Sequence, residues 1–369
     1  MLEFIRIQRF KTLLDASFPL SRLNLFSGLN GMGKSSLIQA LLLLRQSYER
    51  GILFQRGLLL KGDYISLGTG QDVLSEEAEV FSLDFLFKWE GSPPVQFQFD
   101  YAPSSDLQPN ARPAELTEGN TLSLFNSHFQ YLSADRITAR SYYETSDFHI
   151  KELNSLGNHG EYTVHYIAEF FQKRLAIPGL RHDHATSDTL LENINTWMSE
   201  ISPGIQIHAS IQPQLSSASL NYAFVQGKEV TADYKPQNVG FGLTFVLPVV
   251  TSLLRSEPGD LLVIENPEAH LHPAGQAVIG KLCALAAAHG VQLFVESHSD
   301  HFLNGIRVAV KQNPLITPDL MRLFFLERDC TGRTHATTVR NPSIDDNGRV
   351  DFWPDGFFDE WDRQLEKLL

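Results

Sequence analysis

Residues 22–44 read RLNLFSGLNGMGKSSLIQALLLL, and this stretch decides the fold. The apolar residues of 22–28 predict a β-strand, and the apolar spacing of 34–51 predicts a helix that ends at a glycine. Between them, GLNGMGKSS matches the pattern G-x-x-x-x-G-K-[ST]. A glycine-rich turn between a strand and a helix brings backbone N–H groups and the positive end of the helix dipole to an anion. We therefore predict a phosphate-binding loop.

The residue types within this loop suit a nucleotide that carries Mg²⁺. Glycines let the backbone turn tightly and approach phosphate oxygens closely. We expect Lys34 to place its charge on the β- and γ-phosphates, and we expect the Ser35 hydroxyl to bind Mg²⁺. The residues that we expect to contact the nucleotide are Asn30, Gly31, Gly33, Lys34, Ser35 and Ser36.

A second buried strand ends in carboxylates, in the stretch DLLVIENPEAHLHP at residues 260–273. Four apolar residues precede Glu265, which is the spacing of a central strand that delivers one acid to the Mg²⁺ beside Ser35. Asn266 can orient a water molecule but cannot accept its proton, so Glu268 is the candidate general base. The alternative is that hydrolysis is negligible because an amide occupies the base position.

Histidines follow both of the buried strands in this half of the chain. His298 comes just after the apolar strand of residues 291–296, where it can sense the γ-phosphate. His270 and His272 lie two residues apart before a proline, and no further ligands accompany them. We therefore interpret this pair as packing and helix-entry residues rather than as metal ligands.

The order of strands and helices predicts an α/β fold. From about residue 237 helices alternate with strands, which favours a largely parallel sheet. An N-terminal antiparallel layer is indicated by two strands across the Gly-Ser-Pro-Pro turn at 91–94. We expect 1–341 to form one discontinuous head with an internal, mostly helical insertion at about 141–220. We expect 342–369 to form a tail segment with an amphipathic helix.

One more motif completes a fixed series along the chain. NVGFG at residues 238–242 places Gly240 and Gly242 at a helix start, where their N–H groups can meet an anion. With this motif between the phosphate loop and the carboxylate strand, the sequence resembles the ABC-type ATPase heads of the SMC, RecF and OLD groups. It is more similar to a family of predicted bacterial ATPases with a C-terminal domain of unknown function. Nearly the whole chain carries that similarity, in stretches that include YLSADRI, LGNHGEYT, IENPEAHLHP and WPDGFFDEW.

The resemblance implies roles for the motif residues. ATP and Mg²⁺ would be the ligands, with Glu265 as the Walker B acid and His298 as the switch histidine. NVGFG would replace the ABC signature and face the γ-phosphate that a second subunit holds, so that a homodimer sandwiches two ATP molecules. Gln71 would be the residue that touches Mg²⁺ and reports to the insertion.

The function that the resemblance implies is nucleotide-gated regulation of a partner. Such a dimer would hydrolyse ATP slowly and control an effector, such as a nuclease encoded nearby in bacterial defence against phage. The chain departs from the wider class, because it has no Asp-Glu pair at residues 265–266 and no Ser-Gly-Gly signature. Two alternatives stay open: an ATP-locked binding module with negligible hydrolysis, and a DNA-repair ATPase like the SMC and RecF heads.

Composition limits the partners of this chain. Its net charge is −13 and its pI is about 5.4, whereas a free-standing DNA binder usually carries a basic surface. We expect nucleic acid to be contacted only through a partner or a local patch. The two cysteines form no zinc or disulfide pattern. With neither a signal peptide nor a membrane span in sight, we expect a cytoplasmic protein without membrane contact.

Overall fold

A computed structural model of the chain describes residues 1–112, 122–227, 229–328, 336–358 and 360–368. The chain divides into two compact units, and each is described by itself. The first unit comprises Met1–Asn126, Met321–Ser343 and Val350–Leu369, and the second comprises Ser127–Leu320 and Ile344–Arg349. None of the helices in the described ranges is long and apolar enough to cross a membrane.

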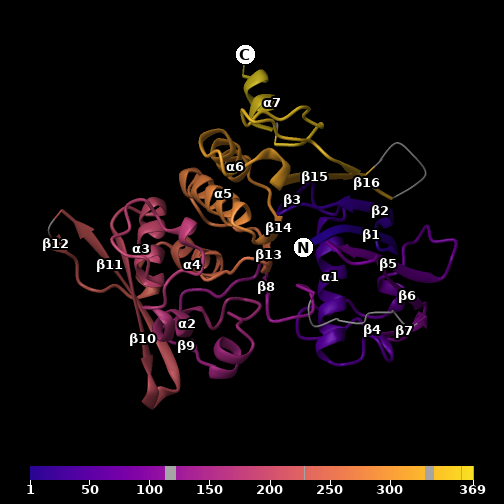
Figure 1. The fold of residues 1–369 in the computed structure, drawn as a ribbon, viewed down its shortest axis with the longest axis horizontal. Coiled ribbons are helices and arrows are strands. Elements are labelled where there is room, and N and C mark those ends of the chain that lie inside the picture. The colour runs from indigo at the N-terminus through magenta and orange to yellow at the C-terminus, as the bar shows by residue number, and fades with distance from the viewer. Residues whose placement is uncertain (113–121, 228, 329–335, 359, 369) are drawn as a thin grey trace. The chain divides into compact units, whose positions relative to one another are not determined.

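An antiparallel sheet with the strand order β2-β1-β5-β6-β7-β4 forms one layer of the first unit (Figure 1). Phenylalanines from alternate positions of its strands pack on one another, as where Phe10 meets Phe85 edge-on at 5.5 Å between ring centroids. The expected N-terminal antiparallel layer is therefore confirmed. Its strands are β1 (Leu2–Phe10), β2 (Leu13–Pro19), β4 (Gly57–Leu59), β5 (Ser82–Trp89), β6 (Val95–Asp100) and β7 (Leu107–Arg112).

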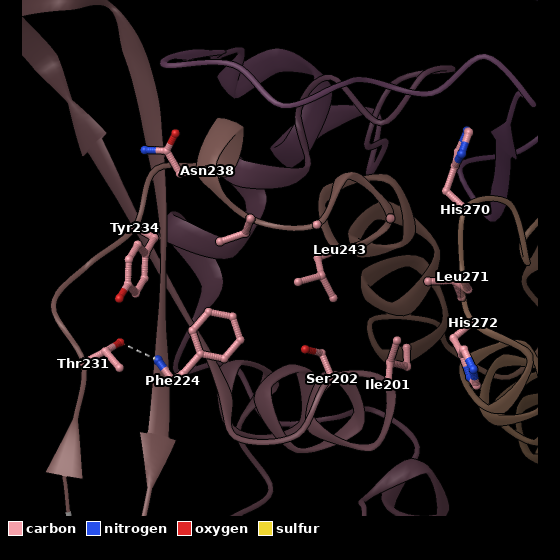
Figure 2. Close-up of a pocket in the computed structure, with 13 residues that line it drawn as sticks. Ile201, Ser202, Phe224, Thr231, Tyr234, Asn238, Leu243, His270, Leu271 and His272 are labelled. Atoms are coloured by element: carbon pink, nitrogen blue, oxygen red, sulfur yellow. Dashed lines mark hydrogen bonds between the residues drawn. The ribbon is translucent and has the colours of Figure 1, made fainter.

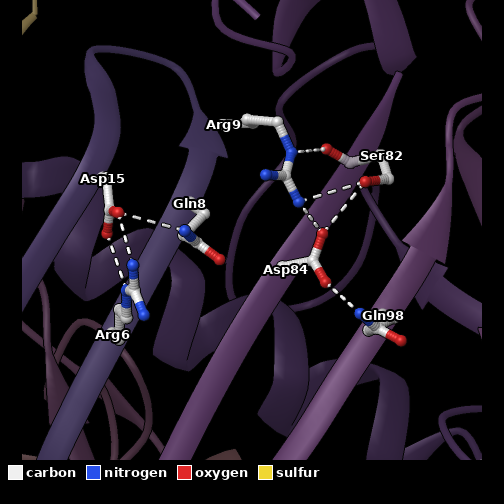
Figure 3. Close-up of polar contacts among 7 residues, drawn as sticks. All are labelled: Arg6, Gln8, Arg9, Asp15, Ser82, Asp84 and Gln98. Atoms are coloured by element: carbon white, nitrogen blue, oxygen red, sulfur yellow. Dashed lines mark hydrogen bonds and ion pairs between the residues drawn. The ribbon is translucent and has the colours of Figure 1, made fainter. Parts of the chain in front are cut away.

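Two polar clusters of different burial lie on this sheet (Figure 3). Asp84 is buried and accepts hydrogen bonds from the Arg9 guanidinium and from Nε2 of Gln98. Arg6 and Asp15 instead form an exposed pair between β1 and β2, with 2.5 Å between Nη2 and Oδ2. The buried cluster fixes the end of β1, where the chain turns into β2.

The remaining elements of the first unit carry the glycine-rich loop. Every residue of β3 is buried, and β3 pairs in parallel with β15, which pairs antiparallel with β16. Helix α1 packs against β1 and β4 (Figure 1). The predicted tail helix is present as α7. The bounds are β3 (Leu23–Ser27), α1 (Lys34–Glu49), β15 (Met321–Arg328), β16 (Thr337–Arg340) and α7 (Glu360–Glu366).

Parallel strands also organise the second unit. Strand β13 lies between β8 and β14 and pairs in parallel with both, so that Ile264 is opposite Leu132 on one side and Val295 on the other. Four apolar, buried residues of β13 explain why it occupies this central position. These strands and the helices α4 to α6 confirm the predicted α/β pattern. Their bounds are β8 (Phe129–Leu132), α4 (Phe241–Leu254), β13 (Leu261–Glu265), α5 (Pro273–Ala288), β14 (Gln292–Glu296) and α6 (Asp300–Gln312).

The insertion contains helices, as expected, but also a long β-hairpin. Helices α2 and α3 pack against β10, which pairs antiparallel with β11 (Figure 1). The expectation of a mostly helical insertion is therefore corrected at its C-terminal end. IQIHASIQ alternates with a period of two, which is the pattern of a half-buried strand. The bounds are β9 (Tyr143–Glu144), α2 (Thr163–Phe170), α3 (Leu190–Ile201), β10 (Ile205–Gln212), β11 (Ser217–Gln226) and β12 (Glu229–Val230).

Candidate functional site

The phosphate loop of the first unit has a backbone that only glycine can form. Gly28 has φ 139°, and a Cβ there would lie 2.2 Å from the carbonyl oxygen of Leu326 on β15. Gly33 has φ 94°, and its Cβ would lie 2.7 Å from Oγ1 of Thr12. Side chains are strained at such φ values even in open space, and here the space is filled as well. The glycines therefore let the loop lie directly against β15 and the β1–β2 turn.

Lys34 begins α1 and folds back over the loop. Its side chain is 3% exposed, and Nζ donates to the carbonyl oxygens of Gly28 at 2.9 Å and Leu29 at 3.0 Å. Gly33 caps the helix without a side-chain hydrogen bond, and the first turn contains no acidic residue. Ser35 and Ser36 thus lie in a first turn whose positive dipole end has no acidic neighbour in that turn, which suits a phosphate group.

Two residues that sequence reasoning missed support the same loop from β15 and β16. Arg328 Nη2 donates a 2.8 Å hydrogen bond to the carbonyl oxygen of Gly31, although it lies 297 residues later in the chain. Thr337 Oγ1 donates to the carbonyl oxygen of Met32 at 3.0 Å. The sequence predicts strands at 320–327 and 335–340, but it gives no register against β3.

Gln71 lies in a short 3₁₀ helix, Gly70–Asp72, of the first unit. It lines a pocket of about 520 Å³ together with Lys11, Thr12 and Arg328. The structure thus brings Gln71 into one pocket with Arg328, which holds the phosphate loop. The acids Asp72, Glu76 and Glu77 also line this pocket, and the expected contact of Gln71 with Mg²⁺ stays a prediction.

Glu265 ends β13 in the second unit. Its Oε2 accepts a 3.1 Å hydrogen bond from the backbone N–H of Ala134, just after β8. Burial raises the pKa of this carboxyl above its usual value, and the Ala134 N–H, the Tyr131 hydroxyl and the charge of Arg136 oppose the rise. Glu265 is therefore held at the carboxyl end of a parallel strand, where α/β proteins place ligand-binding residues.

The chain turns sharply after this carboxylate. Asn266 has φ 45°, and its N–H donates a 2.8 Å hydrogen bond to the carbonyl oxygen of Glu296 on the neighbouring strand. This left-handed conformation is tolerated by asparagine better than by most residues. Among the described residues, Asn266 Oδ1 is one of the buried polar atoms without a hydrogen-bond partner. The turn orients the following residues away from the line of β13.

Glu268 is the buried acid of this loop and is 7% exposed. Its Oε1 accepts the backbone N–H of His298 at 3.0 Å, while its Oε2 is buried and has no hydrogen-bond partner within the described ranges. Burial raises the pKa of Glu268, against hydrogen bonds that favour the ionised form. An ionised carboxylate at this position is the kind of group that can act as a general base. The ring of His298 is half-exposed, with Nε2 4.0 Å from Glu296 Oε1.

Gly242 of NVGFG lies against the same loop at the start of α4. A Cβ on Gly242 would lie 2.3 Å from the carbonyl oxygen of His270, whereas a Cβ on Gly240 would meet no atom within 4 Å. The two glycines, His270 and His272 line a pocket of about 490 Å³ in the second unit, shown with its other lining residues in Figure 2. Gly240 caps α4 and has no side chain that could bond the first N–H groups of the helix, which is a helix start that suits an anion.

The two histidines have the packing and helix-entry roles that we predicted. The ring of His270 meets Phe241 and Phe245 edge-on, with centroids 4.8 Å and 4.9 Å away. Nδ1 of His272 accepts the backbone N–H of Ala274 at 3.3 Å and so caps α5. Within the described ranges, no three His, Cys, Asp or Glu side chains form a group that could hold a metal ion.

The predicted residues thus form two sets. In the first unit are the phosphate loop and Gln71, and in the second are Glu265, Glu268, His298 and the NVGFG glycines. Two observations fit a nucleotide with Mg²⁺. The first turn of α1 carries no acidic residue beside the phosphate loop, and an oxygen of Glu268 is buried without a partner among the described residues.

Comparison with known families gives two matches. Residues 23–304 match the family described as "AAA domain, putative AbiEii toxin, Type IV TA system". Residues 316–368 match a second family, described as "Protein of unknown function (DUF3696)". No curated protein matches the sequence significantly.

Solved structures show that the fold is similar to that of SMC heads. One is the crystal structure of the SmcHead bound to the C-winged helix domain of ScpA, with a TM-score of 0.55 and 14% identity over 93% of this chain and 98% of that chain. Another is the Smc head domain with an extended coiled coil bound to the C-terminal domain of ScpA, derived from Pyrococcus furiosus. It has a TM-score of 0.50 and 13% identity over 100% of this chain and 99% of that chain. The predicted α/β head fold is confirmed.

Proposed function

The chain belongs to the AAA-domain family described as putative AbiEii toxin, Type IV TA system, and from this premise we propose that it is a nucleotide-gated, slowly hydrolysing ATPase that regulates a partner protein. ATP with Mg²⁺ is the ligand in this proposal. Lys34 would leave the loop carbonyls for the β- and γ-phosphates, and Ser35, Glu265 and Gln71 would hold the metal. Bound Mg²⁺ neutralises charge on the phosphates.

Glu268 carries the proposal for hydrolysis. One of its oxygens is fixed by the His298 N–H, and the other is buried without a partner among the described residues. A raised pKa brings a carboxylate closer to neutral pH, where a general base works best. Glu268 takes the proton of the attacking water in this scheme, and His298 reports the γ-phosphate to Glu268 through its backbone.

A second copy of the chain completes the proposed site. Gly240 and Gly242 present the uncapped start of α4 to the γ-phosphate of ATP held by the partner subunit, which makes a dimer with two ATP molecules. Support comes from the open space beside Gly240 and the pocket next to it. ATP binding then closes the dimer, and hydrolysis opens it.

The partner in this proposal is a protein effector, such as a nuclease that acts in bacterial defence against phage inside the cytoplasm. The matched family's description names a toxin and a toxin–antitoxin system, which is a setting of paired proteins. The two similar Smc heads are themselves bound to domains of ScpA. Nucleic acid is contacted only through that partner or a local patch, in line with the net charge of −13.

Purified chain tests the enzymatic part. We expect MgATP to raise the melting temperature and to be hydrolysed, and we expect Lys34→Ala to lose both effects because the phosphates lose their charged partner. Lys173→Ala, which removes an exposed lysine of the second unit, is the control and should behave as wild type. A wild-type chain that neither binds nor hydrolyses ATP would sink the proposal.

An ATP-locked binding module is the second candidate, and Asn266 is the observation that favours it. An amide follows Glu265 directly, and an amide cannot accept a proton. The two candidates separate in single-turnover assays. If MgATP closes a dimer on a sizing column and no phosphate is released, the locked module is the function, and affinity capture with MgATP is then the route to the partner.

A further inference from the structure

Arg136 is a buried arginine that links α4 to the carboxylate loop within the second unit. It is 2% exposed. Its Nη1 donates to the carbonyl oxygen of Glu265 and its Nη2 to that of Asn266, both at 2.5 Å. Its Nε donates to the carbonyl oxygen of Phe245 at 3.2 Å, and its guanidinium carbon lies 4.4 Å from the centroid of the Phe245 ring.

The hydrogen-bond partners of Arg136 lie on helix α4 and on the turn after β13, which have different proposed roles. Phe245 is in the first turns of α4, the helix that begins with the NVGFG glycines. Glu265 and Asn266 form the turn that leads to Glu268. A planar guanidinium has donors in a fixed fork, so one side chain sets the distance and the angle between helix and turn. A lysine has a single ammonium group, which cannot reproduce this fork.

The burial of this cation shows how closely it is held. Burial lowers the pKa of Arg136 to about 10, while the charges of Glu268, Glu265 and Tyr131 oppose the decrease. A buried charge is tolerated only when paired or hydrogen-bonded, and the carbonyl oxygens around Arg136 provide those hydrogen bonds. Arg136 therefore has little freedom to move without the turn and α4.

Additional contacts join the same two elements. Gly242 lies so close to the carbonyl oxygen of His270 that a Cβ would be 2.3 Å from it. The His270 ring packs edge-on against Phe241 and Phe245. A shift at the start of α4 would therefore displace the loop both before Glu268, through Arg136, and after it, through His270. The helix and the loop are thus coupled rather than independent.

We propose that Arg136 is a positioning residue that couples the start of α4 to the turn formed by Glu265 and Asn266. A group bound at the NVGFG glycines would thereby set the position of Glu268. The inference rests on the proposed function, because it gives that site its regulation. In the dimer, the ATP of one subunit would meet α4 of the other, and Arg136 would transmit that contact to the base of its own chain.

Arg136→Lys tests this role against a second arginine of the same unit. Arg255 is partly buried, lies 5.3 Å from the Tyr166 ring centroid and donates to the carbonyl oxygen of Asn154 and to Oε1 of Gln130, away from the turn at 265–268. We expect Arg136→Lys to lower kcat at least tenfold with KM within twofold of wild type. We expect Arg255→Lys to lower the melting temperature comparably and to keep kcat. Equal losses of kcat in the two variants would overturn the inference.

A second measurement needs neither nucleotide nor turnover. Gly240→Ala perturbs the start of α4 without meeting another residue. Hydrogen exchange of the amides of 266–271 should become faster in Gly240→Ala than in wild type. The same substitution should have no further effect when Arg136→Lys is already present, because coupled sites are not additive. If the two substitutions change the exchange rates additively, the coupling is overturned even when the wild-type chain hydrolyses ATP. If the wild-type chain does not hydrolyse ATP, the proposed function fails, but the exchange measurement still tests the coupling.

Discussion

The backbone N–H of His298 donates a 3.0 Å hydrogen bond to Oε1 of Glu268, so the expected γ-phosphate sensor holds the expected base. The two residues follow adjacent parallel strands, β14 and β13, at the same edge of the second unit's sheet. The bond comes from the main chain, and the His298 ring lies with Nε2 4.0 Å from Glu296 Oε1. Oε2 of Glu268 is buried and has no hydrogen-bond partner among the described residues. A movement of the His298 loop must therefore move the base.

Glu268→Gln is expected to abolish turnover without abolishing ATP binding. An amide of the same shape still accepts the His298 N–H but cannot take a proton from water. Loss of general-base catalysis typically costs ~10²–10⁴-fold, so kcat should decrease by about that factor. Phosphate release and binding of a fluorescent ATP analogue measure the two properties separately.

Glu257→Gln is the control for this variant. Glu257 is half-exposed and pairs loosely with Lys173 at 3.9 Å, so its loss should leave turnover and binding unchanged. Wild-type turnover in Glu268→Gln would show that another group accepts the proton, and Asn266 would then be only an orienting residue.

The pH dependence of stability should reveal the buried state of Glu268. Burial raises the pKa of Glu268 above its ordinary value of 4.5. Between that value and the raised pKa, the native state binds more protons than the unfolded state, so the free energy of unfolding decreases as pH rises through this window. Turnover has the opposite dependence, since the base must be ionised. Urea unfolding of wild type and Glu268→Gln from pH 4.5 to 8 should show wild type losing stability relative to the variant. Parallel curves would mean that Glu268 is not buried in solution.

Much of the head could be predicted because its signals are local. A short apolar pattern with a marked end determines each of α1, β13 and β14, as where Glu265 follows four apolar residues. The glycine loop is determined by its own G-x-x-x-x-G-K-[ST] pattern. The candidate base was found for the same reason, since it lies three residues beyond that end. Their positions in the sequence were enough to name them as candidates.

The missed features depend on contacts between distant segments. Arg328 and Thr337 support the phosphate loop only because β15 pairs with β3 in one register, and no local pattern specifies that register. Strand β7 was missed because LQPNAR contains a proline and little apolar character, yet it pairs with β4 and β6. The fork of Arg136 likewise depends on how α4 packs, which is a tertiary outcome.

Gly242→Ala should destabilise the chain more than Gly240→Ala. The new Cβ at Gly242 would lie 2.3 Å from the backbone oxygen of His270, so the helix or the loop must move. Overpacking of this kind costs roughly 1–3 kcal/mol. Gly240 has open space, and replacing a glycine cap by alanine costs about 1 kcal/mol at most. Chemical denaturation of the two variants compares them directly. Equal stability would mean that α4 and the loop are not in contact as described.

Asp84→Asn should cost far more stability than Asp15→Asn, although both substitutions remove one acid from an arginine pair on the same sheet (Figure 3). The side chains of Arg9 and Asp84 are 19% and 5% exposed, against 45% and 46% for Arg6 and Asp15. Removing one partner of a buried pair leaves an uncompensated charge and typically costs ~3–5 kcal/mol; the partial exposure of Arg9 reduces this to about 2–3 kcal/mol. Exposed pairs contribute less than about 1 kcal/mol because water screens them.

Urea unfolding at two salt concentrations separates the cases, since only the Asp15 effect should shrink at high salt. A loss of equal size in both variants would show that burial does not strengthen the Arg9–Asp84 pair.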